Sequence, residues 1–149
     1  MIKIIFIVLN VIMYLYAQDS IITQQQAIGV AKIVRVYDGD TFYADLYSLP
    51  DVFGKNIGIR LIGIDTPELN SKDSCNKALA KAAKDFLEQK LKSACQIELR
   101  NISRDKYFRL DAIVYTDSVN LNDLMIQKGF AKPYTGEGPK PTYTCTKRK

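Results

Sequence analysis

The sequence contains no histidine, and this absence narrows the chemistry that is open to the chain. Histidine is the one side chain whose ordinary pKa makes it an acid–base group near neutral pH, and it is a frequent metal ligand. Enzymes that use histidine as general base, as nucleophile or as metal ligand are therefore excluded. Any proton transfer must come from Asp, Glu, Lys, Tyr or water.

Tryptophan is also absent, and cysteine is scarce. Without tryptophan, stacking on aromatic rings would fall to nine tyrosines and six phenylalanines. The spacing of Cys75, Cys95 and Cys145 fits no zinc site. In an oxidising compartment these residues permit one disulfide and leave one thiol over. Every pairing among them stays open, and we favour Cys75 with Cys145, which would tie down the tail. Cys95 is then expected to be a small buried residue.

The residues that are present describe one domain with a basic surface. The chain has 149 residues, which is enough for one core and not for two. Its charged fraction of 25% and apolar fraction of 47% are ordinary for a globular protein. Lys and Arg exceed Asp and Glu by 21 to 16, which suits a polyanionic partner but also serves solubility alone.

The first 17 residues have the pattern of an export signal. A short basic start, Met1–Lys3, precedes an apolar run of 14 residues from Ile4 to Ala17. A membrane-spanning helix needs about 20 residues, so this run is short for one. A buried helix of the domain is disfavoured because the run is apolar on all sides. We therefore expect a signal peptide at 1–17, a linker at 18–29 and a secreted or periplasmic protein. Leu15 is not the small residue preferred before a cleavage site, so an uncleaved membrane anchor through residues 4–17 stays open.

The remaining chain, residues 30–149, alternates strand and helix patterns. β-Branched runs and turn residues predict strands at 30–37, 41–47, 57–64, 97–102 and 109–115, with a loop at 48–56. Helices are predicted at 74–91, capped by Ser74, and at 120–128, ended by Gly129. The apolar face of the first helix is predicted to contain Ala78, Leu79, Ala82, Ala83, Phe86, Leu87 and Leu91. Five short strands with two or three helices predict an α+β, mainly β domain, and a five-stranded OB-fold barrel fits this count.

Two acidic clusters lie at the ends of predicted strands. Asp38 and Asp40 are separated by one glycine in a turn, so their side chains can share a face. Asp65 and Glu68 follow the third strand and are held by a proline between them. Ca²⁺ takes oxygen ligands from carboxylates, carbonyls and water, so two or three of these carboxylates would serve it. Taken singly, the first cluster is more typical of a plain turn and the second of a helix start.

Two arginines accompany these carboxylates. Arg60 interrupts the apolar run of the third strand, and Arg109 follows a basic turn at the start of the fifth. Strict alternation places Arg60 and Asp65 on opposite faces, whereas a bulge at Gly63 would bring them together. Either arginine alone is more typical of a solvated surface. Guanidinium groups nonetheless bind phosphate in a bidentate manner. Carboxylates for a hard cation and arginines for a phosphate are the parts of a metal-dependent phosphodiesterase.

Taken in order and spacing, four segments resemble the staphylococcal nuclease (thermonuclease) family. The segments are Asp38–Thr41, Arg60–Glu68, Asp105–Arg109 and Leu121–Tyr134. The resemblance runs from about Lys32 to Tyr134. It implies an OB-fold barrel with added helices and an enzyme that cleaves DNA and RNA with Ca²⁺, in a family of which many members are exported.

The resemblance also implies a metal site and a residue that acts on water. Asp40 and Asp65 would be the carboxylate ligands of Ca²⁺, and Thr66 would add its backbone carbonyl. Asp38 would lie near the ion without being a clear ligand. Glu68 would activate or orient the attacking water.

Further residues are implied to hold the substrate. Arg60 and Arg109 would grip the scissile phosphate, while Lys106, Tyr107 and Tyr134 would hold the nucleotide. In-line attack of water on phosphorus would leave a 3′-phosphorylated product. The implied partner is DNA or RNA, with no obligate protein partner, and the protein is expected to be a monomer.

The chain departs from the family pattern in three segments. The loop Ser48–Asn56 is longer than in the best-known member. Phe108 stands where a glycine is usual, which bears on the shape of the turn that presents Arg109. The tail from Tyr134 to Pro141 replaces a tyrosine-rich segment, which bears on the role of Tyr134.

Two other functions stay open beside the enzyme. The same fold can bind nucleic acid or protein without cleaving it, and some family members lack the catalytic residues. A structural envelope protein that keeps an uncleaved anchor is the other alternative. The presence of Asp40, Arg60, Asp65, Glu68 and Arg109 favours the enzyme.

Overall fold

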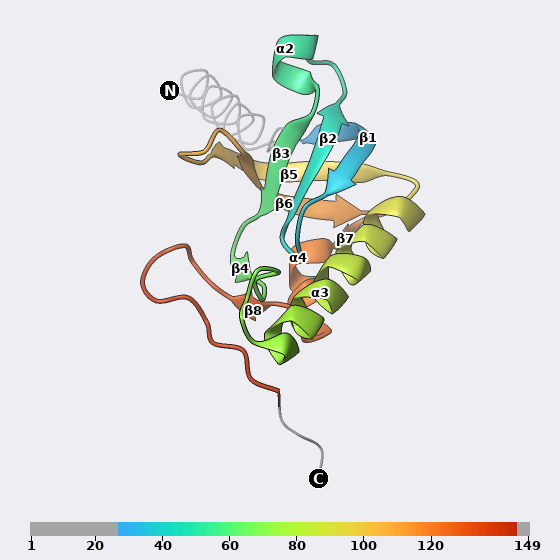
Figure 1. Ribbon diagram of the computed structural model, residues 1–149. Helices are drawn as coiled ribbons and strands as arrows, with labels where there is room; N and C mark the ends of the chain where they lie inside the picture. Colours follow the sequence, from blue (N-terminus) through green and yellow to red (C-terminus); the bar gives the residue numbers. More distant parts are fainter. Residues whose placement is uncertain (1–26, 146–149) are drawn as a thin grey trace, which may run out of the picture.

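Five strands of the chain close into a barrel (Figure 1). The computed structural model describes residues 27–145. Antiparallel pairing joins the strands in the order β3 (Ile57–Leu61), β2 (Thr41–Leu46), β1 (Ile28–Val36), β5 (Ile97–Arg104) and β6 (Leu110–Thr116). A parallel pair between β3 and β6 closes the ring. Together with the helices α2, α3 and α4 of the described residues, this confirms the mainly β OB-fold barrel predicted from the sequence.

The interior of the barrel is filled by alternate residues of its strands. On β6 every second side chain is buried, from Leu110 to Thr116. Phe42 of β2 and Ile59 of β3 are completely buried in the same core. Burial of apolar surface contributes about 25 cal/mol per Å², so this interior fixes the strands and with them the loops at their ends.

The long helix α3 (Ser74–Ser93) packs along the outside of the barrel (Figure 1). Its buried residues are Ala80, Ala83, Leu87 and Leu91. The predicted apolar face is wrong at Ala78 and Ala82, which are exposed. Alanine carries little apolar area, so the large leucines decide which side of the helix faces the barrel, and the alanines one turn earlier follow them.

Short polar side chains cap the two longer helices. Asp73 caps α3 in place of the predicted Ser74, because its carboxylate accepts a hydrogen bond from the Cys75 backbone N–H at 2.8 Å. Asn120 caps α4 (Leu121–Gln127) by accepting from the Asp123 N–H. A two-residue strand, β7 (Val119–Asn120), precedes α4 and pairs with β6. The second predicted helix is therefore confirmed.

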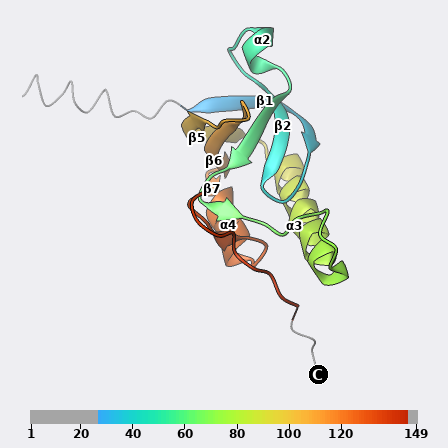
Figure 2. The same cartoon turned by 60° about the vertical axis from the view of Figure 1, so that its left-hand side comes forward.

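The predicted loop at 48–56 contains one turn of helix, α2 (Asp51–Gly54). The N–H groups of Phe53 and Gly54 each donate to the Pro50 carbonyl at 2.8 Å. The fixed φ of proline suits the start of a helical turn, a signal that the loop prediction did not include. The helix projects from the barrel between β2 and β3, away from the C-terminal tail (Figure 2).

The predicted strand at 57–64 is wrong at its end, because the chain turns after Leu61. Gly63 has a φ of +77°, which glycine adopts without steric cost. The chain then forms a separate two-residue strand, β4 (Ile64–Asp65), which pairs with β8 (Lys132–Pro133). A turn at Gly63, rather than the expected bulge, therefore carries Asp65 out of the barrel wall.

The tail after β8 returns past β4 toward the start of α3 (Figure 1). The preferred disulfide between Cys75 and Cys145 is present and ties this tail to α3. The expectation for Cys95 is wrong, because this free cysteine is exposed. Cys95 follows the end of α3 at Ser93 and lies in the connection to β5, outside the packed face of either element.

The predicted signal peptide or anchor at 1–17 lies outside the described residues. The linker predicted at 18–29 extends too far, because β1 already begins at Ile28. Between residues 27 and 145, no helix has both the length and the apolar character required to span a membrane.

Candidate functional site

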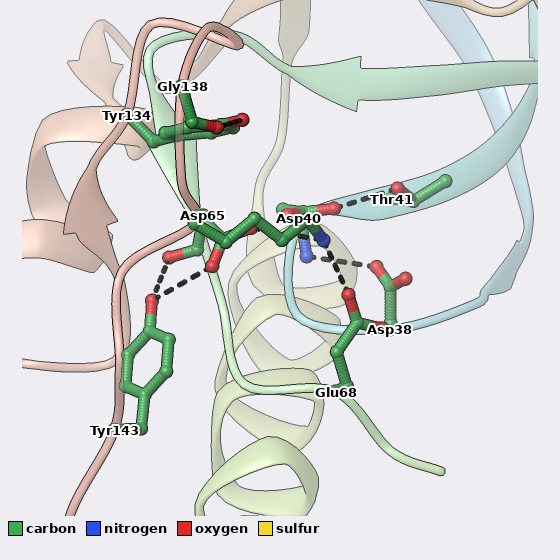
Figure 3. A network of polar contacts seen from close by, with 9 residues as sticks. Asp38, Asp40, Thr41, Asp65, Glu68, Tyr134, Gly138 and Tyr143 are labelled. Carbon is green, nitrogen blue, oxygen red and sulfur yellow. Dashed lines mark hydrogen bonds and ion pairs between the residues drawn. The ribbon is translucent and has the colours of Figure 1, made fainter. Parts of the chain in front are cut away.

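The turn between β1 and β2 holds the first acidic cluster (Figure 3). The N–H groups of Tyr37 and Asp38 both donate to the Thr41 carbonyl, at 2.9 and 3.3 Å. The Asp38 carboxylate accepts from the Asp40 N–H at 3.1 Å. The Asp40 carboxylate accepts from the Thr41 hydroxyl at 2.9 Å and is buried. Asp38 thus supports the turn, while Asp40 is the carboxylate that the turn holds in place.

Gly39 lets this turn approach the second acidic cluster. A Cβ atom at this position would lie 2.8 Å from the Ala83 Cβ and 2.9 Å from the Thr66 Oγ1. Carbon atoms do not pack that closely, so only glycine allows the turn to rest against α3 and Thr66 without displacement. The glycine of the Asp-Gly-Asp sequence therefore brings Asp40 beside the segment that follows β4.

Closure of the barrel brings the two arginines together. In the parallel pair of β3 and β6, Ile59 lies opposite Leu110 and Arg60 opposite Asp111. Arg109 directly precedes β6, and a Cβ on Gly58 would lie 3.0 Å from its Cγ, so Arg109 lies over β3. Arg60 makes no hydrogen bond or ion pair with residues 27–145, which leaves its guanidinium available to a ligand.

A tight turn presents Arg109. The Asp105 carboxylate accepts from the backbone N–H groups of Tyr107 and Arg109, at 2.8 and 2.9 Å, and from the Arg109 Nε at 2.8 Å. Burial pushes the pKa of Asp105 upward, but these hydrogen bonds outweigh it and hold that pKa below its usual range. Because the ion pair uses only Nε, both terminal nitrogens of Arg109 remain for a phosphate as far as residues 27–145 are concerned.

Phe108 keeps the shape of this turn although it is not glycine. Its φ is +65°, in the left-handed region that glycine adopts readily. The turn hydrogen bonds are made: the Phe108 N–H donates to the Asp105 carbonyl at 3.2 Å, and the Asp105 N–H donates to the Arg109 carbonyl at 3.0 Å. The ring is 78% exposed. Phe108 therefore costs backbone strain without displacing Arg109.

Phe108→Gly is expected to raise the free energy of unfolding by about 0.5–1 kcal/mol. The left-handed backbone costs a non-glycine residue roughly 1–2 kcal/mol, and the greater chain entropy of glycine offsets part of the gain. Chemical denaturation would measure the change, with Phe108→Ala as the matched control, since alanine removes the ring but keeps the strained Cβ. A gain in Phe108→Ala as large as in Phe108→Gly would show that the ring, and not the backbone, causes the strain.

The second acidic cluster meets the C-terminal tail (Figure 3). The Lys140 Nζ lies 2.5 Å from Glu68 Oε1 and 3.4 Å from Asp65 Oδ1. The Tyr143 hydroxyl donates to the Asp65 carbonyl and lies 3.5 Å from its Oδ2. Asp65 is 2% exposed, whereas Glu68 is exposed. Lys140 and Tyr143 of the tail therefore contact the polar groups of Asp65 and Glu68.

One open cavity of about 710 Å³ brings nearly all the predicted residues together. Its lining includes Asp38, Asp40, Arg60, Thr66, Glu68, Lys106, Tyr107, Arg109 and Tyr134. Asp65 instead lines a neighbouring cavity of about 320 Å³. The two cavities share Thr66, Pro67, Glu68 and Lys140, so they adjoin each other, and Asp65 lines only the smaller one.

Burial dominates the electrostatics of the carboxylates. It raises the pKa of Asp40 from 3.8 to about 6, and the nearby Asp38 charge adds to the rise, while Arg60 opposes it. Burial also raises the pKa of Asp65, and the charge of Lys140 opposes this rise. The charge of Asp40 acts on Asp65 in the same upward direction. The site thus concentrates negative charge that a cation would stabilise.

Asp40→Asn is expected to stabilise the metal-free protein by about 1–3 kcal/mol at pH 7.5, because a buried charge is removed. Because the pKa of Asp40 is higher in the folded protein, its carboxyl is protonated below about pH 4 in both the folded and the unfolded state and costs no stability there. As the pH rises through about 6 the folded state must bear the buried charge, and stability is lost. The gain should therefore vanish at pH 4. Denaturation in a chelator at both pH values would measure it.

Glu137→Gln is the control for this substitution, since Glu137 is an exposed carboxylate of the tail. It should leave stability unchanged at both pH values. An Asp40→Asn variant that is less stable at pH 7.5 would contradict the cost assigned to the buried charge.

The donor set fits a divalent cation bound mainly by two carboxylates. Asp65 Oδ1 is buried and accepts no hydrogen bond, and Asp40 is a second buried carboxylate near it. Between residues 27 and 145, no group of three or more acidic or cysteine side chains is placed to hold a metal. Backbone carbonyls and water would have to complete the shell, as is common for Ca²⁺.

Comparison with known proteins assigns the chain to a family. A model of the family described as "Staphylococcal nuclease homologue" matches residues 58–147. The chain belongs to the staphylococcal nuclease family. Similar proteins include a thermonuclease of Staphylococcus hyicus, 30% identical over 102 residues that make up 68% of this chain and 57% of the relative. An uncharacterized endonuclease of Haemophilus influenzae is 28% identical over 115 residues, 77% of this chain and 58% of the relative.

Another similar protein is Endonuclease YncB of Bacillus subtilis, which is 31% identical over 100 residues, 66% of this chain and 44% of the relative. The chain thus spans about half the length of the curated relatives that it matches. The family match contains Arg60, Asp65, Glu68 and Arg109. Asp40 precedes it and joins these residues through the turn between β1 and β2.

The sequence analysis did not predict four residues that lie at or beside the candidate site. Lys140 and Tyr143 come from the tail, and Asp111 lies opposite Arg60 and lines the larger cavity. The buried Asn122 of α4 donates to the carbonyls of Ile62 and Ala112, at 2.8 and 3.2 Å, and so fixes the turn after β3. Asp111 had a signal, an acid among apolar residues of a strand, whereas the tail residues had none.

Proposed function

We propose that the protein is a nuclease that hydrolyses phosphodiester bonds of DNA or RNA and depends on Ca²⁺. The observation that carries the proposal is the single cavity in which Arg60, Arg109, Asp40 and Glu68 meet. Proteins similar to this chain carry the names thermonuclease and endonuclease, which supports the same activity.

The two arginines would bind the scissile phosphate and stabilise charge that develops on it. Arg109 is held by Asp105 through Nε, so its fork is oriented before the substrate arrives. Arg60 approaches from β3, the neighbouring strand in the closed barrel. Two guanidinium groups on one phosphate can hold both of the oxygens that do not take part in bond exchange.

Glu68 would orient the attacking water and accept its proton. It is the exposed carboxylate of the cavity, and without histidine the chain offers few other groups for this task. Asp40, Asp65 and the Thr66 carbonyl would hold Ca²⁺, which would neutralise negative charge around the phosphate. The 5′-oxygen would leave, which gives a 3′-phosphorylated product.

The exposed Lys106 and Tyr107, with Tyr134, would hold the nucleotide beside the phosphate. Tyr107 can stack on a base, because every base offers a π-face and the ring is 67% exposed. The Tyr134 hydroxyl donates to the Gly138 carbonyl at 3.1 Å, so a role for Tyr134 would use its ring. We also propose that the protein is exported and acts outside the cytoplasm, on the basis of the signal pattern at 1–17. We propose further that it acts as a monomer.

A binding module without catalysis is the second candidate. It is favoured by one observation, the ion pair between Glu68 and Lys140, which engages the proposed water-activating carboxylate. In that case the cavity would bind a strand through its arginines and aromatic rings and leave it intact.

Cleavage of a labelled single-stranded DNA in Ca²⁺ and in a chelator would test the proposed nuclease, with Glu68→Gln beside the wild type. We expect cleavage only in Ca²⁺, products sensitive to a 3′-phosphatase, and a loss on the order of 10²-fold or more in Glu68→Gln. Glu137→Gln, an exposed change in the tail, is the control. Cleavage that persists in the chelator, or that does not need Glu68, would contradict this assignment of the site.

A further inference from the structure

Lys140 lies beside one of the two carboxylates proposed to hold the divalent cation. Its Nζ contacts Glu68 Oε1 at 2.5 Å and stands 3.4 Å from Asp65 Oδ1, the buried oxygen that accepts no hydrogen bond. A lysine ammonium is a compact point charge on a flexible stem. Its positive charge therefore offsets the negative charge of Asp65 and Glu68, as a small bound cation would.

A strap formed by residues 132–145 delivers this lysine to the site. The Cys75–Cys145 disulfide fixes its end to α3. Lys132 Nζ donates to the Thr142 carbonyl at 2.7 Å, and the Tyr143 hydroxyl donates to the Asp65 carbonyl. Before Lys140 in the chain, Lys132 pairs with Asp65 between β8 and β4, and after it Thr142, Tyr143 and Cys145 are held by the contacts just given. Lys140 is thus kept near Asp65 from both sides of its position in the chain, which gives it a high effective concentration there.

The lysine and a divalent cation cannot both keep close contact with Asp65. Ca²⁺ binds carboxylate oxygens at about 2.3–2.6 Å, and an ammonium beside the same oxygen would then be repelled by two positive charges. The Lys140 side chain is 56% exposed, so it can swing into solvent without unfolding the strap. Because Lys140 is part of the lining of both cavities, movement of the lysine would change the shape of both.

We propose that Lys140 is a built-in competitor of the divalent cation, positioned by the disulfide-anchored strap, and that it sets the affinity of the metal site. This inference rests on the proposed function, because it takes Asp65 as a ligand of Ca²⁺ and Glu68 as the carboxylate beside it that acts on water. The competitor would keep the protein in a charge-balanced state when Ca²⁺ is scarce and yield to the ion when Ca²⁺ is abundant. Lys140 is a determinant of metal affinity in this scheme and not a catalytic residue.

Isothermal titration of the full chain with CaCl₂ tests the inference through binding rather than cleavage. Lys140→Ala should bind Ca²⁺ about three- to tenfold more tightly than the wild type, on the scale of one partly exposed ion pair plus one buried contact. Lys140→Arg, which keeps the charge, should stay within about twofold of the wild type. Lys128→Ala is the control, because Lys128 is an exposed lysine outside the cavities.

A second variant separates the strap from the charge. Cys145→Ser should also tighten Ca²⁺ binding, because the lysine is no longer held at the site, and adding Lys140→Ala to it should bring little further gain. Thermal unfolding with and without CaCl₂ gives an independent measure, since tighter binding to the folded state raises the Ca²⁺-induced shift in midpoint.

Unchanged or weaker Ca²⁺ binding in Lys140→Ala would overturn the inference while leaving the nuclease proposal standing, provided that the wild type binds Ca²⁺ and cleaves. Absence of Ca²⁺ binding in both the wild type and Lys140→Ala would overturn the inference together with the calcium site. These two failures are distinguished by the wild-type titration alone.

Discussion

Arg60→Ala is expected to lower the rate of phosphodiester cleavage by on the order of 10²–10³-fold while the protein stays folded. Loss of one preorganised charge donor from a site of this kind has that magnitude. Arg60 makes no hydrogen bond or ion pair with residues 27–145, so its removal leaves no described partner unsatisfied. Single-turnover cleavage of a labelled strand would measure the rate, and circular dichroism would report the fold.

Arg100→Ala is the matched control for this loss. Arg100 is also a strand arginine, but it lies on β5, where its guanidinium pairs with Glu98 at 2.7 Å outside the cavity. Arg60→Lys should recover part of the rate, since lysine restores the charge without the fork. Normal cleavage by Arg60→Ala would remove Arg60 from the site, and an unfolded variant would make it a structural residue.

Removal of the Cys75–Cys145 disulfide is expected to lower the free energy of unfolding by about 2–4 kcal/mol. The bridge joins residues 70 positions apart, and loop-closure entropy grows with the length of the closed loop. Because Cys145 lies in the tail, part of the loss will come from release of the strap that covers Asp65. Chemical denaturation of a Cys75→Ser/Cys145→Ser double variant would measure the change.

Cys95→Ser provides the control for the disulfide. Cys95 is exposed and free, so this variant should be as stable as the wild type. A double variant that matches the wild type in stability would contradict this prediction and show that the bridge contributes no net stability.

Local sequence signals predicted the barrel and pointed to the segments of the candidate site, because each signal was carried by a short segment. The β6 strand shows strict alternation of buried residues, and the Asp38–Thr41 turn is readable from its glycine. The residue types suggested that Arg60 and Arg109 serve one site, and the family resemblance gave each its role, but no local pattern showed that they approach each other. Their approach depends on the parallel pairing of β3 with β6, which joins residues about fifty positions apart.

The errors arose where tertiary contacts decided between local options. β3 ends at Leu61, where the chain turns through Gly63, and Asn122 of α4 fixes this turn by donating to the Ile62 carbonyl across 60 positions. Ala78 and Ala82 fitted either face of α3, and the leucines decided against them. Lys140 could not be placed at all, because a Pro- and Gly-rich tail has no periodicity and its contact with Glu68 spans 72 positions. The favoured Cys75–Cys145 pairing was the one sequence clue that the tail returns.

Binding and cleavage of the same labelled single strand, followed side by side with the wild-type protein in Ca²⁺ and in a chelator, would test the nuclease proposal most directly. The proposal predicts that the strand is cleaved in Ca²⁺ and remains whole in the chelator. A folded protein that binds the strand in Ca²⁺ but leaves it intact would contradict the proposal and identify the cavity as a binding site.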